Sequence, residues 1–245
     1  MSLETALEQL KNPDREEQKA GISTLAMLAD PQAVMPLAVW IYSLDEDPAN
    51  DKNRAQALKA LANSLTGAEI GLLDSLLPFA QSKSVEVKAA TLLCLGRIFD
   101  PEGKALKAII LGLLSSSKEV VEASAVALSE GFRGEPAHLL RFLVDVYVKP
   151  DLPDFVYEAL LIAFSRVSIQ DPLLRATLRK WVLRDLSSKS ENIQKTAIVV
   201  LEGLYDDENP VPDGVTKKVM EIFLNASEAI QMVAASFLTK CIRKR

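Results

Sequence analysis

Small and apolar residues recur along this chain at helical spacing, in segments separated by short polar turns. One such segment, SVEVKAATLLCLG at residues 84–96, begins with a hydroxyl residue, continues through charged positions and ends in small and apolar side chains. Apolar positions three or four residues apart lie on the same face of a helix. The pattern therefore predicts an amphipathic helix here, and similar segments occur throughout the sequence.

When the segments are aligned on Leu95, they repeat at a nearly constant interval. The equivalent positions are Leu25, Leu61, Leu95, Leu128, Phe164, Leu201 and Leu238. Successive members are separated by 36, 34, 33, 36, 37 and 37 residues. A period of this length is typical of solenoids, in which each unit buries its apolar face against its neighbours.

A second apolar segment precedes most of these helices, so each unit is predicted to be a pair of antiparallel helices. The preceding segments are 33–44, 69–81, 105–115, 136–148, 172–186 and 215–226. The polar stretches between them have the composition of turns and not of linkers. We expect one all-α repeat domain over 1–245, with seven units at approximately 1–30, 31–66, 67–100, 101–134, 135–169, 170–209 and 210–245.

Two further columns of the alignment support this register. Eleven positions before the reference stand Asp14, Asn50, Ser84, Ser117, Pro153, Ser190 and Ser227. All except the proline are helix-capping types, typically worth about 1 kcal/mol each, and we expect Asp154 to cap in place of the proline. Eight positions before the reference stand Glu17, Asn53, Val87, Val120, Val156, Ile193 and Ile230. This column predicts a core position that becomes polar in an N-terminal end cap.

The units resemble HEAT repeats. The third unit is the best match, with DP at 100–101 followed by SVEVKAATLLCLG, and NPDREEQKA and NDKNRAQALKAL are similar in the first two units. Pro31, Pro101, Pro136 and Pro172 occupy the expected early position of the first helix. The basic residue of the HEAT pattern is present in only two units. The resemblance covers nearly the whole chain and implies a right-handed, armadillo-like α-solenoid whose second helices line a concave side.

Composition and charge narrow the function classes. Hydrophobic residues make up 49% of the chain, which is enough apolar surface for a folded core. A net charge of −5 argues against a nucleic-acid partner, because phosphate binding requires a basic face. Cys94 and Cys241 both lie in apolar helical segments and are expected to be reduced. With no segment resembling a signal peptide or membrane span, we expect a cytoplasmic protein.

One column of the second helices predicts a candidate binding surface. With Leu95 facing inward, position 93 and its equivalents lie on the opposite, outward side of the helix. This column reads Ser23, Lys59, Leu93, Val126, Ile162, Val199 and Ser236, so it is apolar only in the central units. Nearby columns add Phe155, Arg97, Glu130 and Arg166. Two interpretations remain open: the apolar side chains pack against the next unit, or they form the floor of a partner-binding groove with a charged rim.

The sequence contains few residues in patterns that suit catalysis or metal binding. One histidine, His138, is too few for a di-iron or zinc site. SSSK (115–118) and SSKS (187–190) resemble a Ser-x-x-Lys nucleophile only superficially, because one serine of each belongs to the cap column. DEDPAND (45–51) lacks the glycine and distal glutamate of an EF-hand loop. No catalytic, cofactor or metal site is therefore predicted.

We expect a non-enzymatic scaffold or adaptor that captures a protein or peptide on the concave face, with neither nucleic acid nor membrane insertion. An alternative implied by the resemblance is a lyase or chaperone-type subunit similar to bilin lyases. A HEAT-like DNA-repair glycosylase is a weaker alternative, because its concave face would be basic. The last unit keeps apolar residues without a polar cap, so a homo-oligomer formed through it is a further expectation.

Overall fold

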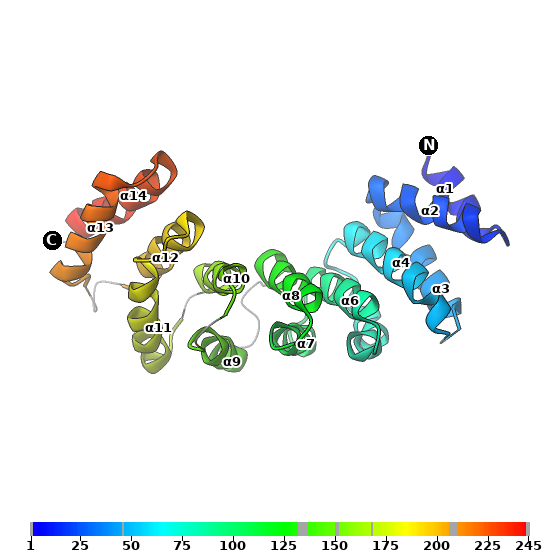
Figure 1. Ribbon diagram of the computed structural model, residues 1–245, viewed down its shortest axis with the longest axis horizontal. Coiled ribbons are helices and arrows are strands. Elements are labelled where there is room, and N and C mark those ends of the chain that lie inside the picture. Colours follow the sequence, from blue (N-terminus) through cyan, green and yellow to red (C-terminus); the bar gives the residue numbers. More distant parts are fainter. Residues whose placement is uncertain are drawn as a thin grey trace. The chain divides into compact units, whose positions relative to one another are not determined.

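The computed structural model describes residues 2–45, 47–131, 137–149, 152–167, 169–205 and 210–243. Within these ranges the regular secondary structure consists of fourteen α-helices and four short 3-10 helices (Figure 1). The helices follow one another as antiparallel pairs, which confirms the predicted all-α fold class.

Within the described ranges the α-helices alternate between leading and second helices. The leading helices are α1 (Leu3–Lys11), α3 (Val34–Ser43), α5 (Leu73–Leu76), α7 (Lys104–Leu113), α9 (Ala137–Tyr147), α11 (Pro172–Asp185) and α13 (Asp213–Asn225). The second helices are α2 (Arg15–Leu28), α4 (Asp51–Ser64), α6 (Val85–Arg97), α8 (Lys118–Gly131), α10 (Asp154–Ser165), α12 (Glu191–Leu204) and α14 (Glu228–Arg243). The 3-10 helices are η1 (Pro31–Ala33), η2 (Pro48–Asn50), η3 (Ile70–Leu72) and η4 (Leu77–Gln81).

The predicted capping column marks the start of every second helix. In all seven pairs the helix begins at the residue directly after the column position. Asp14 accepts a hydrogen bond from the amide of Glu16, and Ser84 and Ser190 accept from the amides three residues further on. These side chains satisfy amides of the first turn that have no partner within the helix.

Two positions in this column do not cap in the predicted way. Asn50 makes no capping bond; it is buried, and its side-chain amide donates to the carbonyl of Asp45 instead. The 3-10 turn before α4 explains this, because Asp47 already caps the chain three residues earlier. Pro153 itself occupies the N-cap of α10, so the expectation that Asp154 caps one position later is wrong. Asp154 is the first residue of the helix.

The leading-helix prolines also need a correction. Pro31 and Pro172 stand at the beginning of η1 and α11, as predicted. Pro101 lies in a turn, because α7 begins only at Lys104. The carboxylate of Asp100 accepts hydrogen bonds from the amide of Glu102 in this turn and from the amide of Ala105 in the first turn of α7, so the helix starts after the proline. Pro136 lies outside the described residues.

Two compact units make up the chain, Met1–Leu139 and Leu140–Arg245. In the first, α2, α4, α6 and α8 pack side by side in chain order, and in the second α10, α12 and α14 do the same. The core of each unit lies between its leading and second helices. The column predicted to be a core position is buried at Val87, Val120, Val156, Ile193 and Ile230. Its first member, Glu17, is exposed on α2, as an N-terminal end cap requires.

In the first unit, α6 and α8 approach each other through residues without large side chains. A Cβ atom added to Gly96 would lie 2.7 Å from the Cα of Ala127. One added to Gly131 would lie 1.5 Å from the carbonyl oxygen of Gly96. Contacts this short between backbones leave no room for a methyl group, so the two helices need glycine at both positions.

The second unit contains a buried polar and aromatic cluster. The hydroxyl of Tyr147 donates to the carboxylate of Asp185, and both residues are buried. Arg184 binds the other oxygen of that carboxylate, with its Nη2 at 2.7 Å. The same guanidinium lies 4.8 Å from the ring centroid of Trp181 and 5.0 Å from that of Tyr157. These contacts tie α9, α10 and α11 together, and every charge in the cluster has a partner.

Candidate partner-binding groove

The outward column of the second helices is accessible to solvent. Val126 on α8 is 42% exposed and Leu93 on α6 is half-buried, although the residues on either side of them along each helix are buried. Since α6 and α8 turn their buried faces toward the leading helices, this column lies on the opposite side of each helix. The interpretation that the apolar side chains are hidden between repeats does not fit Val126.

These side chains line a groove across α4, α6 and α8 with a volume of about 330 Å³. Its lining residues are Lys59, Ala62, Asn63, Leu93, Gly96, Arg97, Val126, Ala127 and Glu130. They come from equivalent positions of three successive second helices. The structure therefore brings four predicted site residues together, namely Leu93, Val126, Arg97 and Glu130.

The shape of this groove follows from the small residues at its base. Ala62, Gly96 and Ala127 place only methyl groups or backbone beneath the opening, because α6 and α8 meet there at backbone distance. Leu93 and Val126 stand beside this base and provide aliphatic surface. An apolar side chain that entered the groove would exchange water for these carbon atoms, which is favourable by about 25 cal/mol for each Å² buried.

Two charged residues of the predicted rim, Arg97 and Glu130, form an ion pair. Nη2 of Arg97 lies 2.5 Å from Oε2 of Glu130, so the two residues bridge α6 and α8 at one edge of the groove. Both side chains are nearly half exposed, with relative accessibilities of 46% and 47%. Pairs in such surroundings contribute at most about 1 kcal/mol because water screens them. The main effect of the pair is therefore to hold two charges in place at the groove edge. Its contribution to the stability of the fold is small.

The other four predicted residues belong to the second unit. Phe155 and Ile162 are half-buried on α10, and Arg166 is exposed at the C-cap of the same helix. Val199 is 39% exposed on α12. The apolar members again lie on the outward side of second helices, as the periodicity predicts.

A depression next to the groove contains residues that the sequence did not single out. It is lined by Pro48, Asp51, Lys52, Ala55, Gln56, Lys59, Lys83, Ser84, Val85 and Glu86. Lys59 lines both the groove and the depression. In the sequence Lys59 and Lys52 are only the polar members of outward columns, and Lys83 is a turn residue. Their proximity arises because α4 and α6 pack side by side.

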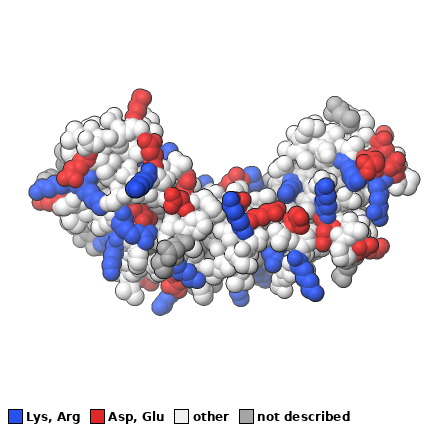
Figure 2. Space-filling model, in the orientation of Figure 1, with Lys and Arg blue, Asp and Glu red and all other residues white. Residues whose placement is uncertain are grey.

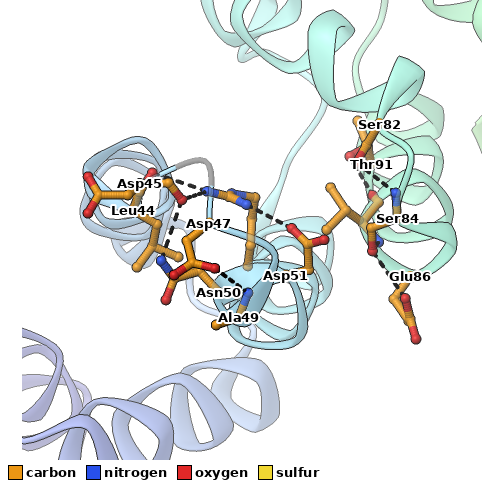
Figure 3. Close-up of polar contacts among 12 residues, drawn as sticks. Leu44, Asp45, Asp47, Ala49, Asn50, Asp51, Ser82, Ser84, Glu86 and Thr91 are labelled. Carbon is orange, nitrogen blue, oxygen red and sulfur yellow. Dashed lines mark hydrogen bonds and ion pairs between the residues drawn. The ribbon is translucent and has the colours of Figure 1, made fainter.

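Figure 3 shows the polar contacts around the beginnings of α4 and α6, where this depression lies. The carboxylate of Asp51 accepts a hydrogen bond of 3.0 Å from buried Arg54. Arg54 also donates to the carbonyls of Leu44 and Asp45, which holds the acidic turn before α4 in place. At α6, the hydroxyl of Ser84 donates to Glu86. The described part of the DEDPAND stretch is thus anchored by an arginine.

The buried cysteine and the serines of the Ser-x-x-Lys-like stretches have structural roles. Burial raises the pKa of the Cys94 thiol, and its Sγ donates to the carbonyl of Leu58. Ser190 is occupied as a helix cap, and Ser117 directly precedes α8. The described residues contain no group of three or more His, Cys, Asp or Glu side chains placed to hold a metal ion. The side chain of His138 lies outside the described residues.

Charges of both signs are interspersed on the described surface shown in Figure 2. None of the helices within the described ranges combines the length and the apolar character that a membrane crossing requires.

Comparisons with known proteins identify the class of fold. No protein-family model matches the sequence, and no curated protein matches it. Among solved structures, the archaeal HEAT-like repeats protein from Thermococcus onnurineus NA1 is 18% identical, with a TM-score of 0.64 over 100% of this chain and 98% of that one. An engineered protein is 17% identical, with a TM-score of 0.65 over 99% of this chain and 71% of the other.

A computationally designed armadillo repeat protein for modular peptide recognition is also similar, at 16% identity. The TM-score is 0.51 over 97% of this chain and 99% of the designed one. These likenesses establish the fold. The chain has the stacked helix pairs of HEAT-like and armadillo repeat proteins, as the sequence resemblance predicts.

Proposed function

We propose that the protein is a non-enzymatic scaffold that captures a segment of a partner protein on the outward side of its second helices. The observation that carries this proposal is the groove across α4, α6 and α8. It combines exposed aliphatic side chains with a base of small residues and a fixed ion pair at its edge. Surfaces that recognise peptides share these elements: an apolar floor for anchoring and polar groups that set orientation.

The repeat fold supports the same function. A stack of similar units presents equivalent positions of neighbouring helices side by side, so a bound segment can contact several units at once. The structurally similar designed armadillo protein is described as made for modular peptide recognition, which supports this use of a helical stack. For this chain we place the primary contact at Leu93 and Val126. In the second unit we propose Phe155, Ile162, Val199 and Arg166 as a separate set of contacts.

A pair of matched substitutions tests the proposal. Val126→Ser removes an aliphatic side chain from the groove, and Val39→Ser makes the same change on α3, where the valine is 63% exposed. Both residues are exposed, so we expect both variants to fold and melt close to the unsubstituted protein. Binding of peptides selected from a random library on the intact chain is then measured by fluorescence anisotropy. Val126→Ser should weaken binding and Val39→Ser should not.

The opposite pattern contradicts the proposal. If Val126→Ser binds the selected peptides as well as Val39→Ser does, the groove is not the capture surface. If Val126→Ser unfolds the first unit, the side chain belongs to the core.

A further inference from the structure

The groove and the adjoining depression follow one another along α4 and share Lys59 as a lining residue; we call the two together the channel. Residues of α4 from Asp51 to Asn63 line the two in succession, and Lys59 belongs to both. At a rise of 1.5 Å per residue this stretch is about 18 Å long. An extended segment that rises about 3.3 Å per residue would cross it with about five residues. The channel thus suits a short linear segment of another chain.

The two ends of the channel differ in chemistry. The end near α8 contains Leu93 and Val126 above the small residues of the groove base. The other end, at the beginnings of α4 and α6, contains Lys52, Lys59 and Lys83. A segment that fits both ends must therefore offer an apolar side chain to one end and groups that accept hydrogen bonds from ammonium to the other.

The carboxylates of the channel already accept hydrogen bonds, whereas its lysines make no direct polar contact with the described residues. Asp51 is bound by Arg54, Glu130 by Arg97, and Glu86 by the hydroxyl of Ser84. By contrast, Lys52, Lys59 and Lys83 are exposed, and none of them forms a hydrogen bond or salt bridge within the described part of the chain. Glu86 has no cation in direct contact, although its own backbone amide, the hydroxyl of Ser84 and the charge of Lys59 lower its pKa. The depression is lined by three lysines and two carboxylates, and one of these carboxylates is bound by Arg54, so positive charge is in excess among its lining residues.

From this arrangement, and resting on the proposed function of the groove, we infer that the partner segment is acidic: it places two or more Asp or Glu residues beside one apolar residue. The carboxylates lie against Lys52, Lys59 and Lys83, and the apolar side chain lies against Leu93 and Val126. The whole chain carries a net charge of −5, so an acidic segment needs a local excess of positive charge such as this one in order to bind.

The test uses random linear peptides displayed on phage and selected on the intact chain, followed by anisotropy measurements with the enriched peptides. One variant carries Lys52→Gln, Lys59→Gln and Lys83→Gln. A matched control carries Lys107→Gln, Lys180→Gln and Lys217→Gln, which removes the same charge from exposed positions on the leading helices α7, α11 and α13. Circular dichroism melting establishes that both variants remain folded.

We expect the enriched peptides to combine acidic residues with an apolar one and to bind more weakly as ionic strength rises. The channel variant should bind about tenfold more weakly, as expected for three lost surface charge pairs, while the control keeps the original affinity. Enrichment of basic or uncharged peptides, equal affinities for channel and control variants, or no enrichment at all would overturn the inference.

The Val126→Ser variant separates this inference from the function on which it rests. If that substitution abolishes binding while the lysine substitutions change nothing, the groove captures peptides and only the acidic preference is wrong. If the lysine substitutions abolish binding while Val126→Ser changes nothing, the apolar capture surface is wrong.

Discussion

Replacing Gly96 with alanine should destabilise the first unit, because α6 and α8 touch there through their backbones. The new Cβ would lie 2.7 Å from both the Cα and the Cβ of Ala127 and 2.8 Å from its carbonyl oxygen. These neighbours are main-chain atoms or a methyl fixed to the main chain, so the helices must separate. Overpacking of this kind costs about 1–3 kcal/mol. The higher helix propensity of alanine offsets up to about 1 kcal/mol.

The net loss for Gly96→Ala is therefore about 1–2 kcal/mol. In a chain of this size each kcal/mol changes the melting temperature by about 2–4 °C, so we expect a decrease of about 2–8 °C. Gly203→Ala is the matched control, because Gly203 also lies near the end of a second helix but a Cβ there meets nothing within 4 Å. The control should melt at the original temperature or slightly above it.

Differential scanning calorimetry of the two variants and the unsubstituted chain measures both effects. If Gly96→Ala melted at or above the temperature of Gly203→Ala, the backbone contact between α6 and α8 at Gly96 would be contradicted. A decrease seen equally in both variants would also contradict it, because the steric cause is present only at Gly96.

Other consequences follow from the contacts described above. Arg97→Ala should lower the free energy of urea unfolding by less than about 1 kcal/mol, because the pair with Glu130 is screened by water; a loss well above that would show a buried role. Native Cys94 should resist alkylation that labels it in urea, since burial raises its pKa and excludes the reagent; mass spectrometry of the labelled peptides decides this. Burial and the neighbouring Asp185 raise the pKa of Tyr147, so the folded state favours the protonated phenol. The resulting stability is present below the unfolded pKa of 10.0 and declines as the pH rises above it, and Tyr147→Phe should weaken that alkaline decline.

Much of the fold could be predicted because its determinants are local in sequence. A hydroxyl or carboxyl residue caps the helix that directly follows it, so the column containing Ser84 and Ser190 located the helix starts to the residue. The 3.6-residue period likewise placed Leu93 and Val126 on the outward side. Asn50 failed as a cap because a 3-10 turn, anchored through Arg54, precedes its helix.

The site could be predicted only in part, because a groove depends on how neighbouring helices are staggered. The sequence predicts Arg97 and Glu130 only as flanking charges, yet the stagger of α6 and α8 pairs them with each other. In the sequence pattern Lys59 is the polar end of an apolar row. Side-by-side packing of α4 and α6 places it at the junction of two depressions. Ion pairs and shared cavities of this kind depend on the distances between neighbouring repeats. The periodicity within one repeat gives no information on those distances.

The most direct measurement of where a partner binds is a methyl NMR titration of the chain, isotopically labelled at Leu and Val, with a selected peptide. If the peptide binds in the groove, the methyl signals of Leu93 and Val126 shift together as peptide is added, while those of exposed Val39 on α3 stay in place. Shifts at Val39 with unchanged signals at Leu93 and Val126 would contradict capture on the row of second helices.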